Sequence, residues 1–280
     1  SIGYSPCPND TFIFYALMHG KVFNESYRFD QIFEDVETLN RMALESRLDV
    51  AKISYHALGH IRDEYCLLRS GGALGKGCGP LVIARNECDM SDLAGKRIAV
   101  PGRYTTAFLL LKLYDPVFGD NVVFMPFDRI METVKEGEAD AGLIIHESRF
   151  TYELYGLKEV IDLGQWWESK TGLPIPLGAI VARRTLGEGV IADLDSMIRS
   201  SIDYAYSHRE ETIPYIKNHS QEMSDEVIDK HIGLYVNEFS LDIGEEGEKA
   251  IKALIDMAEG KEIFKANDVS LFRKKDSGAC

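Results

Sequence analysis

Short apolar runs alternate with helical patterns over the first part of the chain. The apolar run at residues 50–54 predicts a short buried strand, and residues 55–61 follow it as a helix. At residues 35–46, apolar side chains such as Leu39 and Met42 recur at helical spacing. Strands and helices that alternate in this way predict a parallel sheet covered by helices.

Two later apolar segments resemble each other, because residues 79–85 and 176–183 are both strand-like and both end in Ala-Arg. The chain between them has its own alternation of strands and helices. We therefore expect an inserted α/β lobe at residues 85–183 and a discontinuous α/β lobe formed by residues 1–84 and 184–280. The pattern predicts strands at 96–100, 122–125, 141–145 and 160–163, and helices at 105–114, 129–136, 191–207, 213–218, 225–237 and 247–259.

The segment at residues 5–12 is a proline-punctuated turn between an apolar lead-in and an amphipathic run. Pro6 and Pro8 restrict the backbone and favour extended conformations in the residues before them. This pattern predicts a strand, a tight loop and the start of a helix, whose free N–H groups suit a carboxylate ligand. The candidate helix caps are Asn9, Asp10 or Thr11 in this segment, and Asp193 and Ser224 in the C-terminal part.

Composition and charge narrow the classes of function. The net charge is −14, with 31 basic and 45 acidic residues, which argues against non-specific binding to nucleic acid. No apolar run approaches the about 20 residues of a membrane span, and no export signal is visible at the start of the sequence. The five cysteines are scattered without a CxxC pair, so we expect reduced thiols.

Two such lobes joined by crossing strands would form a cleft. Ligands of open α/β sheets bind outside the carboxyl ends of the strands. The loops that follow the predicted strands are therefore the informative positions, at residues 5–11, 52–55, 101–106 and 146–149.

His146 directly follows the apolar run at residues 142–145. A histidine at the end of a strand that faces a cleft can act as a general base near neutral pH. A histidine that caps a helix or packs against one is the alternative that position alone leaves open.

Two further loops offer polar groups to a ligand. Thr105 and Thr106 lie between a strand and a helix, where they could hold a carboxylate or hydroxyl or simply cap the helix. Lys52, near Ser54, lies inside an apolar run, so it should find a carboxylate from the protein or a ligand. Otherwise its ammonium group would reach solvent at the edge of the strand.

Other candidate residues give weaker indications of a functional site. His56 and His60 have the spacing of metal ligands but no third ligand, so we predict no metal site. The glycine-rich segment 70–79 fails the phosphate-loop pattern and is expected to be a flexible loop, or mobile lid, beside the cleft. We expect Cys7 and Cys78 to be small buried thiols. Trp166 and Trp167 are expected to cover a domain edge or to stack on a ligand. The remaining histidines, His19, His208, His219 and His231, are expected to be solvated.

The family resemblance depends on five segments that occur in order along essentially the whole chain. Together they resemble the 1,4-dihydroxy-6-naphthoate synthase family, menaquinone enzymes of the futalosine pathway. The segments are SPCPNDTF at 5–12, EDVETLN at 34–40, SGGALG at 70–75, PGR with TT at 101–106, and GLIIHESRF at 142–150.

This resemblance implies an α/β, two-lobed fold of the type II periplasmic-binding-protein kind, with a ligand cleft between the lobes. It also implies a cytoplasmic lyase without a metal or organic cofactor. Its substrate would be cyclic dehypoxanthinyl futalosine, a carboxylic acid, and its products 1,4-dihydroxy-6-naphthoate and dihydroxyacetone. The general base of the family maps onto His146, and its substrate contacts map onto Lys52, Ile53, Ser54, Thr105 and Thr106. Asn9 and Asp10 are expected to shape the floor of the cleft.

Two alternatives remain at the level of sequence. One is chorismate dehydratase, which has the same fold and belongs to the same pathway; the motifs around Pro6 and His146 point away from it. The other is a solute-binding protein without catalysis. The sequence makes no prediction of the oligomeric state.

Overall fold

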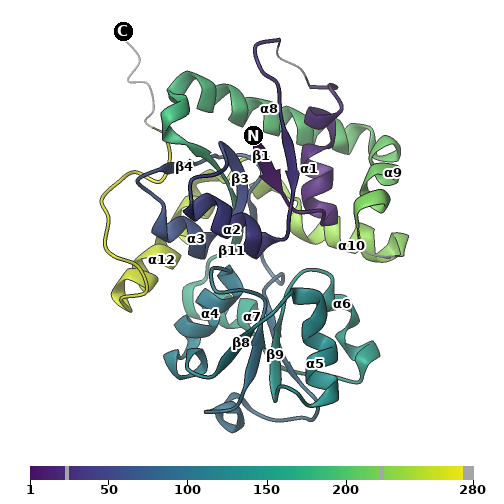
Figure 1. Ribbon diagram of the computed structural model, residues 1–280, viewed down its shortest axis with the longest axis vertical. Coiled ribbons are helices and arrows are strands. Elements are labelled where there is room, and N and C mark those ends of the chain that lie inside the picture. The colour runs from purple at the N-terminus through teal and green to yellow at the C-terminus, as the bar shows by residue number, and fades with distance from the viewer. Residues whose placement is uncertain (23–24, 221–223, 274–280) are drawn as a thin grey trace.

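A computed structural model describes residues 1–22, 25–220 and 224–273 of the chain. Two β-sheets with helices packed against them form an upper and a lower part of the molecule (Figure 1). The first and the last described residues belong to the upper part, and the middle of the chain builds the lower part. No helix within these described ranges is both long enough and apolar enough to span a membrane.

The first sheet contains β1 (Ile2–Tyr4), β2 (Gln31–Phe33), β3 (Val50–Ser54), β4 (Tyr65–Leu67), β5 (Ala73–Gly75) and β11 (Ile175–Arg183). Their order is β2-β1-β3-β11-β4, and β5 also pairs with β11. β1 runs parallel to β2 and β3. β11 runs antiparallel to β3, β4 and β5.

The second sheet contains β6 (Leu81–Ala84), β7 (Ile98–Val100), β8 (Val122–Phe124), β9 (Ala141–Ile144) and β10 (Lys158–Asp162), in the order β10-β6-β9-β7-β8. β7 is parallel to β8 and β9, whereas β6 is antiparallel to β9 and β10. The predicted parallel pairing is confirmed for β1, β2 and β3, but the expectation of a wholly parallel sheet is wrong. Both sheets are mixed, because β6 and β11 run against their neighbours.

Twelve α-helices are described: α1 (Pro8–Met18), α2 (Val36–Leu44), α3 (Tyr55–His60), α4 (Thr106–Tyr114), α5 (Ile130–Glu136), α6 (Ser148–Thr151), α7 (Leu163–Thr171), α8 (Glu188–Ser207), α9 (Arg209–His219), α10 (Asp225–Tyr235), α11 (Glu238–Leu241) and α12 (Gly244–Gly260). Short 3₁₀ helices lie at Met90–Leu93, Pro116–Gly119, Phe127–Arg129, Tyr152–Tyr155 and Arg184–Leu186.

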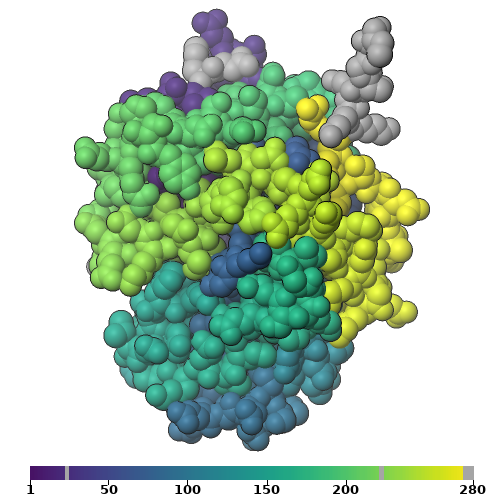
Figure 2. Space-filling model, turned by 180° about the vertical axis from the view of Figure 1, so that it is seen from behind, coloured from purple at the N-terminus to yellow at the C-terminus, as the bar shows by residue number. Residues whose placement is uncertain are grey.

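The chain passes between the two sheets twice. β5 belongs to the first sheet and β6 to the second, so the first passage falls at residues 76–80. The blue atoms of this region emerge between the green upper part and the teal lower part (Figure 2). The return falls at residues 172–174, between α7 and β11. We propose these passages as the lobe boundaries, in place of crossings near residues 85 and 180.

The start of α1 differs from the expected one. The helix begins at Pro8, and Cys7 precedes it without a side-chain capping bond. Proline suits the first position of a helix, because it lacks an N–H group that would otherwise stay unpaired and its backbone angle is already helical. The three candidate caps, Asn9, Asp10 and Thr11, therefore lie inside the helix, and the prediction of a cap there is wrong.

Of the two helix caps predicted in the C-terminal part, one is wrong and one is confirmed. α8 begins one turn earlier than expected, directly after Gly187, so Asp193 lies inside the helix and does not cap it. Ser224 does cap α10, because its hydroxyl accepts a hydrogen bond from the Val227 N–H at 3.3 Å. That prediction is confirmed.

The glycine-rich segment is not a flexible lid. Its centre is β5, which pairs with β11, and Gly71 N–H donates to the carbonyl of Ser240 at 2.7 Å. Only Lys76 and Gly77 are exposed in this segment. The expectation fails because strand pairing outweighs the local freedom of the glycines.

α1 is buried on all sides, and this burial positions two polar side chains. Its residues from Pro8 to Leu17 are buried, and it packs against α8, α9 and α10. A helix that is apolar around most of its circumference belongs in the interior. Asn9 and Asp10, in its first turn, are consequently held inside the protein and need polar partners there.

Gly79 generates a prediction about stability. A Cβ atom at this position would lie 2.2 Å from the backbone nitrogen of Gly164, at the start of α7. Backbone cannot move aside as a flexible side chain can, so Gly79→Ala should lower the free energy of unfolding by about 1–3 kcal/mol or more. Urea unfolding measures this change. Gly189→Ala is the control, since nothing lies within 4 Å of that Cβ; equal stability of the two variants would contradict the prediction.

Candidate active site

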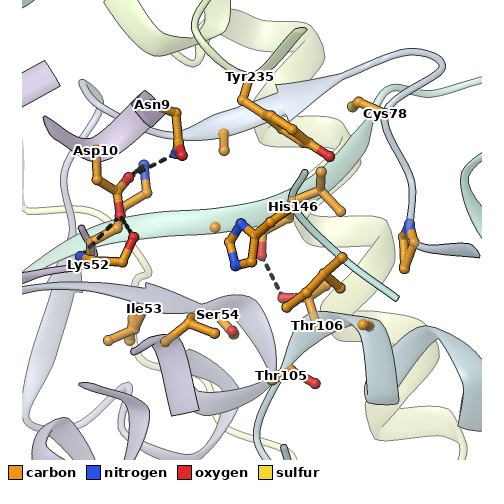
Figure 3. Close-up of a pocket in the computed structure, with 18 of the residues that line it drawn as sticks. Asn9, Asp10, Lys52, Ile53, Ser54, Cys78, Thr105, Thr106, His146 and Tyr235 are labelled. Atoms are coloured by element: carbon orange, nitrogen blue, oxygen red, sulfur yellow. Dashed lines mark hydrogen bonds and ion pairs between the residues drawn. The ribbon is translucent and has the colours of Figure 1, made fainter. Parts of the chain in front are cut away.

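A pocket lies between the two sheets and brings together all eight residues that the sequence proposed for a site. It has about 720 Å³ of empty space, counting the part open to solvent, which is the size of a small-molecule site. Figure 3 shows these side chains, which come from both parts of the molecule. The eight residues are Asn9, Asp10, Lys52, Ile53, Ser54, Thr105, Thr106 and His146.

A buried ion pair lies at one end of this pocket. Lys52 Nζ is 3.6 Å from Asp10 Oδ1, and it also donates a hydrogen bond to the carbonyl of Gly71. Asp10 Oδ2 accepts hydrogen bonds from the Ser5 hydroxyl at 2.7 Å and the Ser5 N–H at 3.2 Å. The expectation that Lys52 finds a carboxylate is confirmed. Burial lowers the pKa of Lys52, and Asp10 opposes that change.

The end of β3 adds Ile53 and Ser54 to the wall. The Ile53 side chain belongs to the hydrophobic core and also lines the pocket. The Ser54 N–H donates to Asn40 Oδ1 at 2.8 Å, and its hydroxyl accepts from the Asn40 amide at 3.1 Å. This pair of bonds ties the strand to α2 and leaves the Ser54 hydroxyl proton available to a ligand.

The two threonines have most of their hydroxyl capacity occupied. The Thr105 hydroxyl caps α4 by accepting from the Phe108 N–H at 3.3 Å, and it donates to the Gly102 carbonyl. The Thr106 hydroxyl donates to the Leu177 carbonyl at 2.6 Å and accepts from the Tyr55 N–H at 2.9 Å. What remains for a ligand is the start of α4 itself, where the first N–H groups lack partners within the helix.

His146 lies two residues after the end of β9, and its imidazole lies in the centre of the pocket (Figure 3). Its backbone has a φ of 56°, which is uncommon outside glycine and is typical of strain held at functional sites. It also lines a second, adjoining pocket with Glu147 and Asp35. Burial lowers the pKa of the imidazole, whereas Glu147, Asp10 and Asp35 act in the opposite direction.

Helix α10 supplies residues that sequence reasoning missed. Tyr235 lines the pocket, and the ring of His231 lies 6.2 Å from that of His146 with 8° between the ring planes. His231 is fully buried, so the expectation that it is solvated is wrong. The sequence does contain a sign of this burial, because His231 shares one helix face with Ile228, Ile232 and Tyr235. These residues form the buried stripe of α10.

Of the remaining candidates, Cys78 lines the main pocket and Cys7 the adjoining one, whereas His56 and Trp167 belong to the core. The described part of the chain contains no group of three or more residues that could hold a metal ion, and His56 instead packs in the core beside Lys112. Trp167 is a core residue whose Nε1–H donates to Pro174. Cys7 and Cys78 are buried free thiols, as predicted, and Cys280 lies outside the described residues.

Comparisons with known proteins agree over most of the chain. A family model described as menaquinone biosynthesis matches residues 1–260. The 1,4-dihydroxy-6-naphthoate synthase of Thermus thermophilus is 56% identical over 97% of this chain and 98% of that protein. The protein of the same name from Streptomyces coelicolor is 50% identical over 92% of each. This chain belongs to the menaquinone-biosynthesis family.

As a member of this family, the chain is an enzyme that acts on a small molecule of the menaquinone pathway. The resemblance carried by the five sequence segments is thereby confirmed.

Solved structures give the same answer for the fold. Protein AF1704 from Archaeoglobus fulgidus superposes with a TM-score of 0.88 at 42% identity, over 94% of this chain and 97% of that one. The alkanesulfonate-binding protein SsuA from Xanthomonas axonopodis superposes with a TM-score of 0.69 at 13% identity, over 95% and 93% of the chains. The predicted periplasmic-binding-protein-like fold is confirmed.

Lys52→Met should destabilise this family member strongly. It leaves the buried Asp10 carboxylate without its cation, which costs about 3–5 kcal/mol when one partner of a buried pair is removed. Urea unfolding at neutral pH measures the loss. Lys21→Met is the matched control, because the Lys21–Glu211 pair is about 40% exposed and exposed ion pairs contribute little to stability. Similar losses in the two variants would contradict the importance of the buried pair.

Proposed function

We propose that this enzyme converts cyclic dehypoxanthinyl futalosine into 1,4-dihydroxy-6-naphthoate and dihydroxyacetone, with His146 as the general base. The observation that carries the proposal is the imidazole of His146 in the pocket between the two sheets, next to polar groups at both ends. The names of the Thermus and Streptomyces relatives support the naphthoate product.

The base would act on a proton bound to carbon. His146 takes the acidic proton beside the substrate ketone, and the electron pair of that C–H bond forms an enolate. The enolate electron pair then displaces the ring oxygen, which takes up the proton held by His146 as the sugar-derived ring opens. A carbon–carbon bond breaks next, its electron pair stays with the ring system, and the three-carbon fragment leaves as a carbonyl compound. Aromatisation of the remaining rings drives the sequence. An uncharged imidazole suits this step, and the burial that lowers its pKa keeps it uncharged at neutral pH.

The two ends of the pocket suit the two polar ends of the substrate. The start of α4, at Thr105 and Thr106, offers backbone N–H groups and the positive end of the helix dipole to the carboxylate. Lys52 and Ser54 would hold an oxygen at the other end, where charge develops on the enolate. Asn9 and Asp10 form the floor behind Lys52 and hold its position.

His146→Ala should lower kcat by about 10²–10⁴-fold, the usual contribution of a general base, with a small change in KM. Steady-state turnover of cyclic dehypoxanthinyl futalosine, followed by formation of the naphthoate, measures this loss. His208→Ala is a control histidine variant, because His208 is exposed at the end of α8. Near-normal turnover in His146→Ala would remove the residue from the role of base. Conversion of chorismate in place of the futalosine derivative would overturn the proposed substrate.

The fall of kcat/KM at low pH, the acid limb of the pH profile, should reflect protonation of His146. The base works only when unprotonated, so activity is lost as the pH falls through its pKa. Burial lowers this pKa from the usual 6.5, so the midpoint of the limb should lie below 6.5, with full activity retained at pH 7. A pH profile of the purified enzyme measures it. Two results together would contradict the assignment. They are an acid limb whose midpoint lies above pH 6.5, and the same limb still present in the pH profile of His146→Ala.

A further inference from the structure

The wall behind His146 contains a second, fully buried imidazole. The rings of His146 and His231 are parallel within 8°, with their centroids 6.2 Å apart. Phe127 approaches His146 edge-on, at 5.1 Å and 62°. His231 does not line the pocket, so it faces the His146 ring and not the substrate.

A chain of hydrogen bonds determines which nitrogen of His231 carries the proton. Asn9 Nδ2 donates to the Asp10 carboxylate at 2.8 Å, and a carboxylate can only accept. The amide oxygen of Asn9 therefore faces His231 Nε2, at 3.0 Å. Nε2 must be the protonated nitrogen, and Nδ1 is left with a free lone pair. Nδ1 is buried and has no hydrogen-bond partner among the residues that the structure describes.

The surroundings of His231 keep its ring uncharged. Burial lowers the pKa of His231 well below its usual range, and His146 acts in the same direction. The groups in contact are the neutral amide of Asn9 on α1, the ring of Tyr235 on its own helix and His146 itself. None of these compensates a positive charge.

We propose that His231 is a positioning residue for the reaction: its locked, uncharged ring orients the His146 imidazole and keeps water away from its inner face. This inference rests on the proposed role of His146 as the base. The other titratable groups around His146 are unchanged by a substitution at His231. They are Cys7 and Asp10 near the start of α1, Asp35 before α2, Lys52, Cys78, Asp128, Glu147, His219 at the end of α9, and Tyr235.

Two variants at this position separate the flat ring from the hydrogen bond. His231→Phe and His231→Ala both lose the bond to Asn9, but only the phenylalanine keeps a flat, uncharged ring against His146. In His231→Ala we expect kcat to fall about 10–100-fold with KM changed less than about threefold, because misplacing a reacting group by about 1 Å can cost about 10²-fold in rate. In His231→Phe we expect kcat within about fivefold of the wild type.

The pH profile gives a readout that a purely structural role would not move. Water that enters beside His146 in His231→Ala relieves the burial that lowers the pKa of the base. The acid limb should therefore move to higher pH in His231→Ala and stay in place in His231→Phe. Equal loss of activity in both variants with unshifted limbs, or wild-type kcat in a folded His231→Ala, would overturn the proposal.

One measurement does not need a variant. Nitrogen-15 NMR of the histidine-labelled wild-type enzyme should show His231 as the neutral Nε2–H form from pH 6 to 8. A charged ring or the Nδ1–H form in this range would overturn the proposal even if the variants failed to fold.

The double variant His146→Ala/His231→Ala separates this inference from the proposed function. If His231 acts through His146, its removal should cost less than about twofold further in the His146→Ala background. Normal turnover in His146→Ala would refute the base itself. An inactive His146→Ala beside a fully active His231→Ala would refute only the positioning role.

Discussion

A buried ion pair organises the site. Lys52 on β3 and Asp10 on α1 are both almost inaccessible to solvent. Their pairing connects the first turn of α1 to the centre of the first sheet. Asp10 also holds the loop through Ser5 and orients Asn9, which in turn contacts His231. Because Ser5, Asn9, Asp10 and Lys52 each have a polar partner, the cost of burying these four side chains is offset within the network. The pocket wall beside His146 thus depends on one carboxylate.

The site is assembled from segments that are far apart in the chain. His146 follows β9 of the second sheet, whereas Lys52 and the α10 histidine belong to the part built on the first sheet. The loop before α4 is joined to α2, since the Tyr104 N–H donates to Glu37 at 2.9 Å. These contacts link the two parts directly across the pocket. The distance between the His146 imidazole and its neighbours is consequently set by how the two parts meet.

The pattern of apolar and polar residues predicts the features that depend on neighbouring residues in the sequence. The bounds of β3 agree with the apolar run at residues 50–54, and His146 was expected at the end of a strand for the right reason. The directions of β6 and β11 were missed, because pairing partners are chosen by tertiary packing. The burial of His231 was missed for the same reason: its partner Asn9 lies 222 residues away in sequence. The start of α1 was displaced by Pro8, whose effect on a helix start is stronger than that of a polar cap.

The central claim is that the pocket between the sheets holds the naphthoate acid against the imidazole of His146. A crystal structure of the enzyme with 1,4-dihydroxy-6-naphthoate bound tests it most directly. The account predicts the carboxylate at the start of α4, beside Thr105 and Thr106, and the aromatic rings in contact with His146. A product bound elsewhere, such as the groove between α12 and residues 267–272, with His146 untouched, would contradict it.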